Sequence, residues 1–153
     1  MNGDAPAEVR FGLLGPILVS SAGSAAAVRA ARQRTLLEAL LLRANRVVAA
    51  DELADQVWDG VPPAGAAATL PSYVLRLRRA LGPVAGGRLQ TRSPGYLIEV
   101  REDSELDLQL FAALRRMAQD AAAGQDWSGA AAGWRAGSSR ALARRLRTLP
   151  TPT

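Results

Sequence analysis

The sequence contains no cysteine, no histidine and no lysine among its 153 residues. The absence of cysteine and histidine excludes disulfide bonds, zinc sites with Cys or His ligands, thiol nucleophiles and every catalytic triad that needs an imidazole. Only carboxylates and hydroxyls remain for enzymatic chemistry. We therefore expect no enzyme, no cofactor and no bound metal ion. The use of arginine for all 19 cations is attributed to the codon usage of a GC-rich genome.

Long apolar runs are also missing. No stretch approaches the roughly 18 to 20 uninterrupted apolar residues that a membrane-spanning helix needs. The N-terminal sequence MNGDAPAEVR carries acidic residues and has no apolar core of the kind found in signal peptides. We expect a soluble, cytoplasmic protein that does not contact a membrane.

Negative charge is absent from one long segment, Thr69 to Tyr96. This segment has no Asp or Glu but contains five arginines, namely Arg76, Arg78, Arg79, Arg88 and Arg92. Surface helices usually interleave arginine with glutamate at neighbouring positions, and no such pairs exist here. In a chain of net charge +5, this unbalanced positive charge predicts an anionic partner such as nucleic acid. The alternative is an ordinary surface helix whose arginines are solvated.

The first half of this segment has the period of an amphipathic helix. Apolar residues recur at intervals of four, three and four positions and form one stripe, made up of Leu70, Val74, Leu77 and Leu81. The helical wheel predicts an opposite, exposed face that consists of Ser72, Leu75, Arg76 and Arg79. Gly82 can adopt positive φ and Pro83 cannot continue the hydrogen-bond ladder, so the helix should end there.

The second half of the segment reads as a β-hairpin. Two short strands, Leu89 to Arg92 and Tyr96 to Val100, flank a three-residue loop that ends at Gly95. We expect a positive φ at this glycine. A basic helix followed by a basic hairpin is typical of a winged helix.

The N-terminal part of the chain predicts a small sheet. Two apolar runs, Val9 to Leu14 and Ile17 to Val19, are separated by Gly15 and Pro16, which indicates a tight hairpin. Residues 20–27 are small and polar and should form a loop. A third short strand is expected at Val28 and Arg29.

Two further helices are expected before the basic one. The first covers Ala31 to Ala44, and Arg32 and Arg34 in its first turn are candidates for phosphate contacts, with two solvated side chains as the alternative. A short strand at Val47 and Val48 follows. Asp51 is the expected N-cap of the second helix.

Trp58 at the end of the second helix should pack against the core. Four carboxylates occur in the same helix, at Asp51, Glu52, Asp55 and Asp59. Consecutive exposed positions of a short helix seldom converge on one ion, so these residues are expected to be a solvated face and not a metal site. The following loop should extend over residues 60–68, and the basic helix should begin near Ala68 or Thr69.

The chain resembles the OmpR-type winged-helix domain of the Streptomyces antibiotic regulatory protein family, which consists of pathway-specific activators of secondary-metabolite gene clusters. The resemblance covers Val9 to Val100 and rests on the order of the elements and on the motifs LADQVW, TLPSYVLRLRRALG and GRLQTRSPGYLIEV. It implies an α+β fold in which a small antiparallel sheet, three helices and a C-terminal hairpin wing pack together. The third helix would lie in the major groove and the wing in the adjacent minor groove.

The resemblance also implies roles for single residues. It matches Tyr73, Arg76 and Arg78 to helix positions that contact DNA, and Arg92 to a wing position that reaches the minor groove. The family usually has serine where this chain has Leu75, which cannot hydrogen-bond to a base but can pack on a thymine methyl group. The predicted DNA-binding residues are thus Ser72, Tyr73, Leu75, Arg76, Arg78, Arg79 and Arg92, and the further phosphate contacts Arg32, Arg34 and Arg88.

The partners implied by the resemblance are double-stranded DNA, as direct repeats near promoters, and RNA polymerase, which the loop at residues 60–68 would contact. A homodimer on DNA is a further expectation. A second class of function remains open: the chain could be a truncated, non-activating remnant or a protein-interaction module that keeps the winged-helix fold.

The remaining boundaries complete the expected organisation. Residues 1–8 should be a flexible N-terminus and residues 9–100 the DNA-binding domain. The resemblance implies that residues 101–137 open a helical, TPR-like activation domain, which is incomplete because about three repeats are normally needed for stability. Residues 138–153 contain four arginines and no acid, and we expect a disordered basic tail, either natural or an out-of-frame end.

Overall fold

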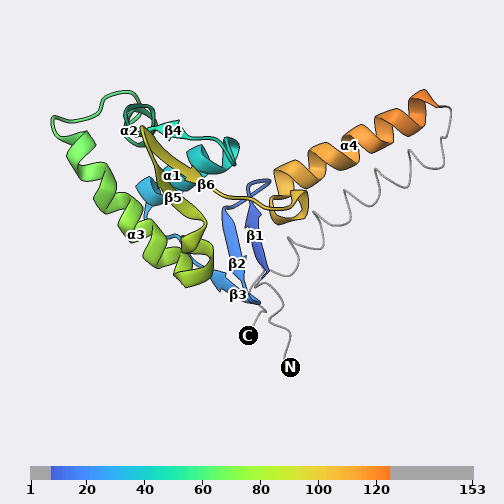
Figure 1. The fold of residues 1–153 in the computed structure, drawn as a ribbon, viewed down its shortest axis with the longest axis horizontal. Helices are drawn as coiled ribbons and strands as arrows, with labels where there is room; N and C mark the ends of the chain where they lie inside the picture. The colour runs from blue at the N-terminus through green and yellow to red at the C-terminus, as the bar shows by residue number, and fades with distance from the viewer. Residues whose placement is uncertain (1–7, 125–153) are drawn as a thin grey trace. The chain divides into compact units, whose positions relative to one another are not determined.

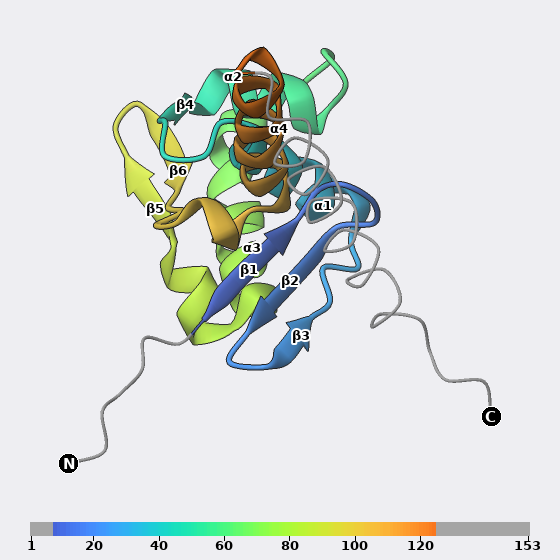
Figure 2. The ribbon, with the colours of Figure 1, turned by 90° about the vertical axis from the view of Figure 1, so that its right-hand side faces the viewer.

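The computed structural model describes residues 8–124, which form an α+β fold. It begins with a three-stranded antiparallel sheet of β1 (Val9–Gly12), β2 (Leu18–Ser21) and β3 (Ser24–Ala26), in that order. Figure 2 shows the three strands side by side. The predicted β1–β2 hairpin is confirmed, with Phe11 opposite Val19.

The predicted third strand at Val28 and Arg29 is wrong. The chain turns back at Ala22 and Gly23, which have φ values of 50° and 78°, and it pairs with β2 immediately afterwards as β3. The segment that was expected to be a loop therefore contains the strand. The small side chains of β3 fit beside β2, although a run of small and polar residues is more typical of a loop.

Three helices follow, α1 (Ala31–Leu42), α2 (Ala50–Val57) and α3 (Ala66–Gly87). Figure 1 shows α3 as the long helix at one side of this group. The predicted apolar stripes are buried, with Leu36, Leu37, Leu40 and Leu41 on α1 and Leu70, Val74, Leu77 and Leu81 on α3. The core of the fold lies where these stripes meet.

Two predicted helix starts need correction. The N-cap of α2 is Ala49, without a side-chain cap, and Asp51 lies in the first turn, where its charge still favours the helix terminus. α3 begins at Ala66, earlier than expected, because Gly65 takes a positive φ of 89° and directs the chain into the helix. The predicted end of the basic helix is confirmed, since Gly82 breaks it with φ 78° and ψ 176°.

The wing consists of β5 (Leu89–Arg92) and β6 (Gly95–Ile98), and β4 (Val48–Ala49) pairs with the other edge of β6. The loop between the two strands is shorter than predicted. Arg92 pairs with Gly95, so only Ser93 and Pro94 lie between the strands. Gly95 does not have the expected positive φ. It is buried, and a Cβ there would collide with the carbonyl oxygen of Val48 and lie 2.8 Å from the Cα of Ala49.

Asn45 fastens the end of β6 to the turn that follows α1. It has a φ of 64°, its Nδ2 donates to the carbonyl of Val100 at 2.7 Å, and its Oδ1 accepts from the Val100 N–H at 2.8 Å. Its backbone N–H donates to the carbonyl of Ile98 at 2.9 Å. Asparagine tolerates the left-handed backbone region better than most residues. Its side-chain amide here makes the two hydrogen bonds to the Val100 backbone that a neighbouring strand would otherwise make.

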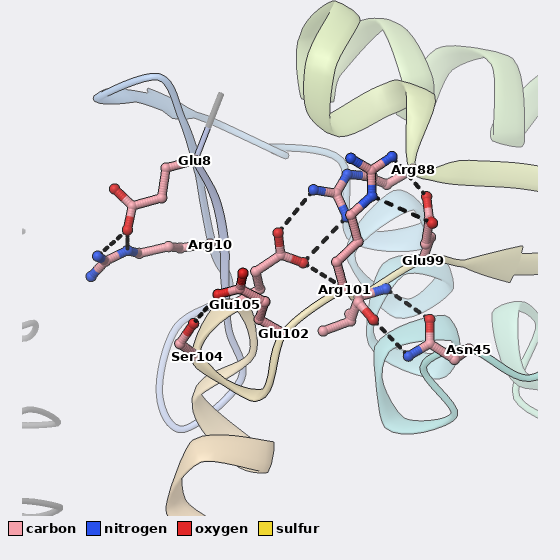
Figure 3. Close-up of polar contacts among 10 residues, drawn as sticks. Glu8, Arg10, Asn45, Arg88, Glu99, Arg101, Glu102, Ser104 and Glu105 are labelled. Atoms are coloured by element: carbon pink, nitrogen blue, oxygen red, sulfur yellow. Dashed lines mark hydrogen bonds and ion pairs between the residues drawn. The ribbon is translucent and has the colours of Figure 1, made fainter. Parts of the chain in front are cut away.

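A buried ion pair holds the segment after the wing. Arg88 donates to both carboxylate oxygens of Glu105, at 3.2 and 2.8 Å, and the side chains are only 7% and 12% exposed (Figure 3). The same carboxylate accepts the backbone N–H of Arg101 at 2.6 Å. Glu105 belongs to the short 3₁₀ helix η1 (Asp103–Glu105), and the next residue, Leu106, is buried and bridges to Phe11.

The first compact unit therefore extends to Leu106, and the boundary expected after Val100 lies too early. The second unit begins at Asp107 with α4 (Asp107–Ala123). The rest of the expected TPR-like segment, the basic tail at residues 138–153 and most of the expected flexible N-terminus lie outside the described residues. None of the helices in residues 8–124 combines the length and the apolar character of a bilayer-spanning segment.

We predict that Gly95→Ala lowers the free energy of unfolding by about 2 to 4 kcal/mol, because the new methyl group must separate β4 from β6. Gly87→Ala is the matched control, since nothing lies within 4 Å of its added Cβ, and it should be neutral or slightly stabilising. Urea unfolding of both variants measures the difference. Equal stability of the two variants would contradict the close approach of the strands.

Removal of one member of the buried ion pair should be costly. Glu105→Ala leaves the Arg88 guanidinium buried without its counter-charge, so we expect a loss of about 3 to 5 kcal/mol. The double variant Arg88→Met, Glu105→Leu should recover most of this loss.

The control for this experiment is Glu99→Ala, which removes a more exposed carboxylate 3.4 Å from Arg101 and should cost less than about 1 kcal/mol. Urea denaturation of all three variants gives the free energies of unfolding. A cost for Glu105→Ala no greater than that for Glu99→Ala would show that the buried pair does not hold η1.

Candidate nucleic-acid interface

The outward face of α3 carries the residues that the helical wheel placed there. Ser72, Leu75, Arg76 and Arg79 are all exposed, while the leucines and valine of the opposite stripe are buried. Leu75 is 46% exposed. Among the described residues, none forms a hydrogen bond or ion pair with the guanidinium of Arg76 or Arg79. Both arginines can therefore reach an external partner.

Tyr73 lies at the edge of this face in a three-residue cluster. Its ring meets that of Trp58 edge to face, with the centroids 5.6 Å apart and an interplanar angle of 88°. Arg32 lies over the Trp58 ring at 5.6 Å and donates to the Tyr73 hydroxyl at 3.2 Å. Edge-to-face and cation–π contacts of this kind orient side chains as well as stabilising them. Trp58 packs against Tyr73 but is half-buried and does not belong to the buried core, and the cluster joins the start of α1, the end of α2 and α3.

Arg78 points toward the wing. Its Nε donates to the carbonyl oxygen of Leu89 and one terminal nitrogen donates to Oγ1 of Thr91, each at 2.9 Å. The side chain is half-buried. The sequence pattern could not reveal these bonds, because they join α3 to a strand more than ten residues away.

The wing presents a second basic group. Arg92 is exposed at the end of β5, next to the exposed turn residues Ser93 and Pro94. Its Nε and one terminal nitrogen donate to Oε1 of Gln90, at 3.2 and 3.0 Å. Gln90 and Arg92 lie two residues apart on one face of the strand, so the glutamine orients the guanidinium beside the turn.

The three additional arginines predicted to contact phosphate differ in their surroundings. Arg32 and Arg34 are both exposed near the start of α1, and Arg34 donates to the carbonyl of Arg29 at 2.6 Å. Arg88 is 6% exposed and paired with Glu105, so its prediction as a phosphate contact is wrong. A sequence pattern of charge alone cannot distinguish a buried, paired arginine from an exposed one.

The segment that carries this surface contains no negative charge. Residues 60–98, which contain the whole of α3 and the whole β5–β6 wing, include no Asp or Glu. Within residues 8–124, no three His, Cys, Asp or Glu side chains lie close enough together to hold a metal ion, and this includes the acids of α2. One of them, Glu52, pairs with Arg43. The geometry provides exposed donors on a helix and on a hairpin tip without a nearby carboxylate on the same segment.

Comparisons with known proteins agree with this geometry. Residues 27–98 match the family model described as "Transcriptional regulatory protein, C terminal". The transcriptional regulatory protein MoaR1 of Mycobacterium tuberculosis is 34% identical over 118 residues, which are 75% of this chain and 38% of MoaR1. The regulatory protein AfsR of Streptomyces coelicolor is 41% identical over 100 residues, which are 65% of this chain and 10% of AfsR. The chain thus spans well under half the length of these relatives.

A solved structure shares the fold. Mycobacterium tuberculosis EmbR, determined in complex with a low affinity phosphopeptide, superposes with a TM-score of 0.70 and 32% sequence identity, over 84% of this chain and 36% of that one. MoaR1 and EmbR are transcriptional regulatory proteins, and AfsR is a regulatory protein. With its exposed basic helix and wing, the chain carries the OmpR-type winged-helix domain of transcriptional regulatory proteins over residues 27–98, and the relatives it resembles, such as AfsR and the transcriptional regulator RedD of Streptomyces coelicolor, are regulators of the Streptomyces antibiotic regulatory protein family.

Proposed function

We propose that this chain binds double-stranded DNA in a sequence-specific manner, with α3 in the major groove and the β5–β6 wing in the adjacent minor groove. The observation that carries the proposal is the acid-free segment on which Arg76, Arg79 and Arg92 are exposed on two neighbouring elements. Figure 1 shows the hairpin alongside α3. A major groove about 12 Å wide accepts one helix, so the wing is left to contact the neighbouring groove.

The residues of α3 divide into base and backbone contacts. Arg76 lies at the centre of the exposed face and can form two hydrogen bonds with guanine, while Ser72 can donate to or accept from either strand. Leu75 fits the methyl group of a thymine, and its exposed position without a polar role supports this assignment. Arg79 is assigned to the phosphate backbone, which sets the register of the helix.

The cluster at the start of α1 supplies further backbone contacts. Arg32 and the Tyr73 hydroxyl are held together by their 3.2 Å hydrogen bond, and both can donate to one phosphate group. Arg34 is also exposed, but it lies two residues from Arg32 and therefore on a different side of α1, so we assign it to a second phosphate group. Charge-assisted bonds from arginine to phosphate are shorter and stronger than neutral ones.

At the level of gene regulation, we propose an activator of a secondary-metabolite cluster that binds direct repeats near promoters, with two copies arranged on the repeats. The α2–α3 loop is the proposed contact with RNA polymerase. It exposes Val61 at 80% together with Pro62 and Pro63, and exposed apolar groups in a proline-containing loop are suited to a protein partner.

We predict that Arg76→Ala weakens binding to the best duplex selected from a random pool by about 1 to 3 kcal/mol. The thermal stability of the Arg76→Ala protein should change little, because the Arg76 side chain is exposed. Arg10→Ala on β1 removes the same charge away from α3 and serves as the control. An unchanged dissociation constant for Arg76→Ala would reject the proposed base contact.

The wing yields a separate prediction. Arg92→Ala should weaken binding to sites with A·T pairs beneath the wing more than to sites with G·C pairs, because a narrow A·T minor groove concentrates negative potential. Fluorescence anisotropy with two duplexes that differ only in those pairs measures the effect. If both duplexes lose affinity equally, Arg92 contacts only phosphate.

Measuring the affinity for DNA at several salt concentrations distinguishes a sequence-specific regulator from a module that keeps the fold but does not regulate. Phosphate contacts alone give a steep dependence of affinity on salt without discrimination between duplexes. A regulator should bind its selected duplex at least about a thousandfold more tightly than random DNA. Equal affinity for both would favour the non-regulating alternative.

A further inference from the structure

The wing has an open edge that faces α3. In the sheet order β4–β6–β5, β5 is the outer strand. The carbonyl of Arg88 accepts from the N–H of Glu99 on the β6 side at 2.8 Å, and antiparallel pairing alternates along a strand, so the next carbonyl, that of Leu89, is directed away from β6. The Nε of Arg78 donates to this carbonyl oxygen.

A second bond makes the connection directional. One terminal nitrogen of Arg78 donates to Oγ1 of Thr91, so a single guanidinium spans the backbone of one residue and the side chain of another on β5. The planar group of arginine presents its donors in a fixed fork, whereas a lysine ammonium has no preferred plane. Two hydrogen bonds from one rigid plane restrain both the distance between β5 and α3 and the angle between them.

The backbone of the same residue is restrained as well. After the break at Gly82, the chain folds back, and Gly86 approaches the carbonyl of Arg78 so closely that a Cβ on the glycine would collide with it. The segment that leads into β5 is therefore packed on the backbone of Arg78 while its side chain holds β5 itself.

We propose that Arg78 is a positioning residue that sets the angle between α3 and the wing, so that the helix and Arg92 are arranged for two grooves before DNA is bound. This inference rests on the proposed function. It differs from the expectation that Arg78 contacts DNA directly, because its Nε and one terminal nitrogen are already engaged with β5. A wing held in advance does not lose conformational freedom upon binding, and this preorganisation increases affinity.

The test removes one of the two bonds without changing any arginine. Thr91→Val deletes the hydroxyl acceptor and keeps the shape and the strand preference of the side chain. Thr91→Ser keeps the hydroxyl and is the matched control. Arg92→Ala and Arg76→Ala are then introduced into the wild-type, Thr91→Val and Thr91→Ser proteins, and the dissociation constant for the selected duplex is measured for each.

In the wild-type and Thr91→Ser proteins, we expect Arg92→Ala to weaken binding about tenfold. In the Thr91→Val protein the same substitution should weaken it only about two- to threefold, because an unrestrained wing gains less from its contact. Arg76→Ala should produce the same fold-change in all three proteins, since α3 is held by the core. Amide hydrogen exchange of residues 89–98 in the free protein should be faster in Thr91→Val than in Thr91→Ser.

Other outcomes overturn the inference in distinguishable ways. If Arg92→Ala weakens binding equally in all three proteins, Arg78 does not position the wing, and the proposed function still stands. If the effects of Arg76→Ala and Arg92→Ala shrink together in Thr91→Val, the substitution loosens the whole domain. If neither arginine matters in the wild-type protein, the proposed function fails and the inference fails with it.

Discussion

The arrangement of this domain depends on the burial of one stripe of α3. Leu70, Val74, Leu77 and Leu81 are between 0 and 2% exposed, and burial of such side chains stabilises a fold by about 1.5 to 3 kcal/mol each. A rotation of the helix about its axis would expose these groups to water. The stripe therefore fixes which residues face outward, and Arg76 and Arg79 are exposed because they lie on the face of the helix opposite to this stripe.

The five arginines of the acid-free segment have different roles although their charge is identical. Two of them, Arg76 and Arg79, face outward from α3, and Arg92 lies at the tip of the wing. Arg78 is bonded to β5, and Arg88 is buried against Glu105. Only Arg88 has its charge compensated by a carboxylate, whereas Arg78 keeps its positive charge, because its two acceptors on β5 are neutral.

The links around the wing share one physical character. Asn45, Arg78 and Arg88 each satisfy backbone or carboxylate groups of segments that are distant in sequence. A hairpin of two short strands is at best marginally stable by itself. These contacts therefore add the stability that the small buried area of the wing does not provide. The proposed DNA recognition by two elements requires that their separation and angle match the spacing of the grooves, and under that proposal the link through Arg78 has a functional role as well as a structural one.

The sequence by itself determined the elements whose signals are local. The apolar period placed the buried face of α3, and the exposed positions Ser72, Leu75, Arg76 and Arg79 followed from it; Gly82 and Pro83 marked the end of the basic helix, and the two runs of the wing marked its strands. Only the tertiary structure decided which contacts join these elements. Gly95 is required by the approach of β4 and not by a turn, Arg88 is buried, and β3 forms from residues that resemble a loop. Periodicity and turn propensity depend on neighbours along the chain, whereas these features depend on neighbours in space.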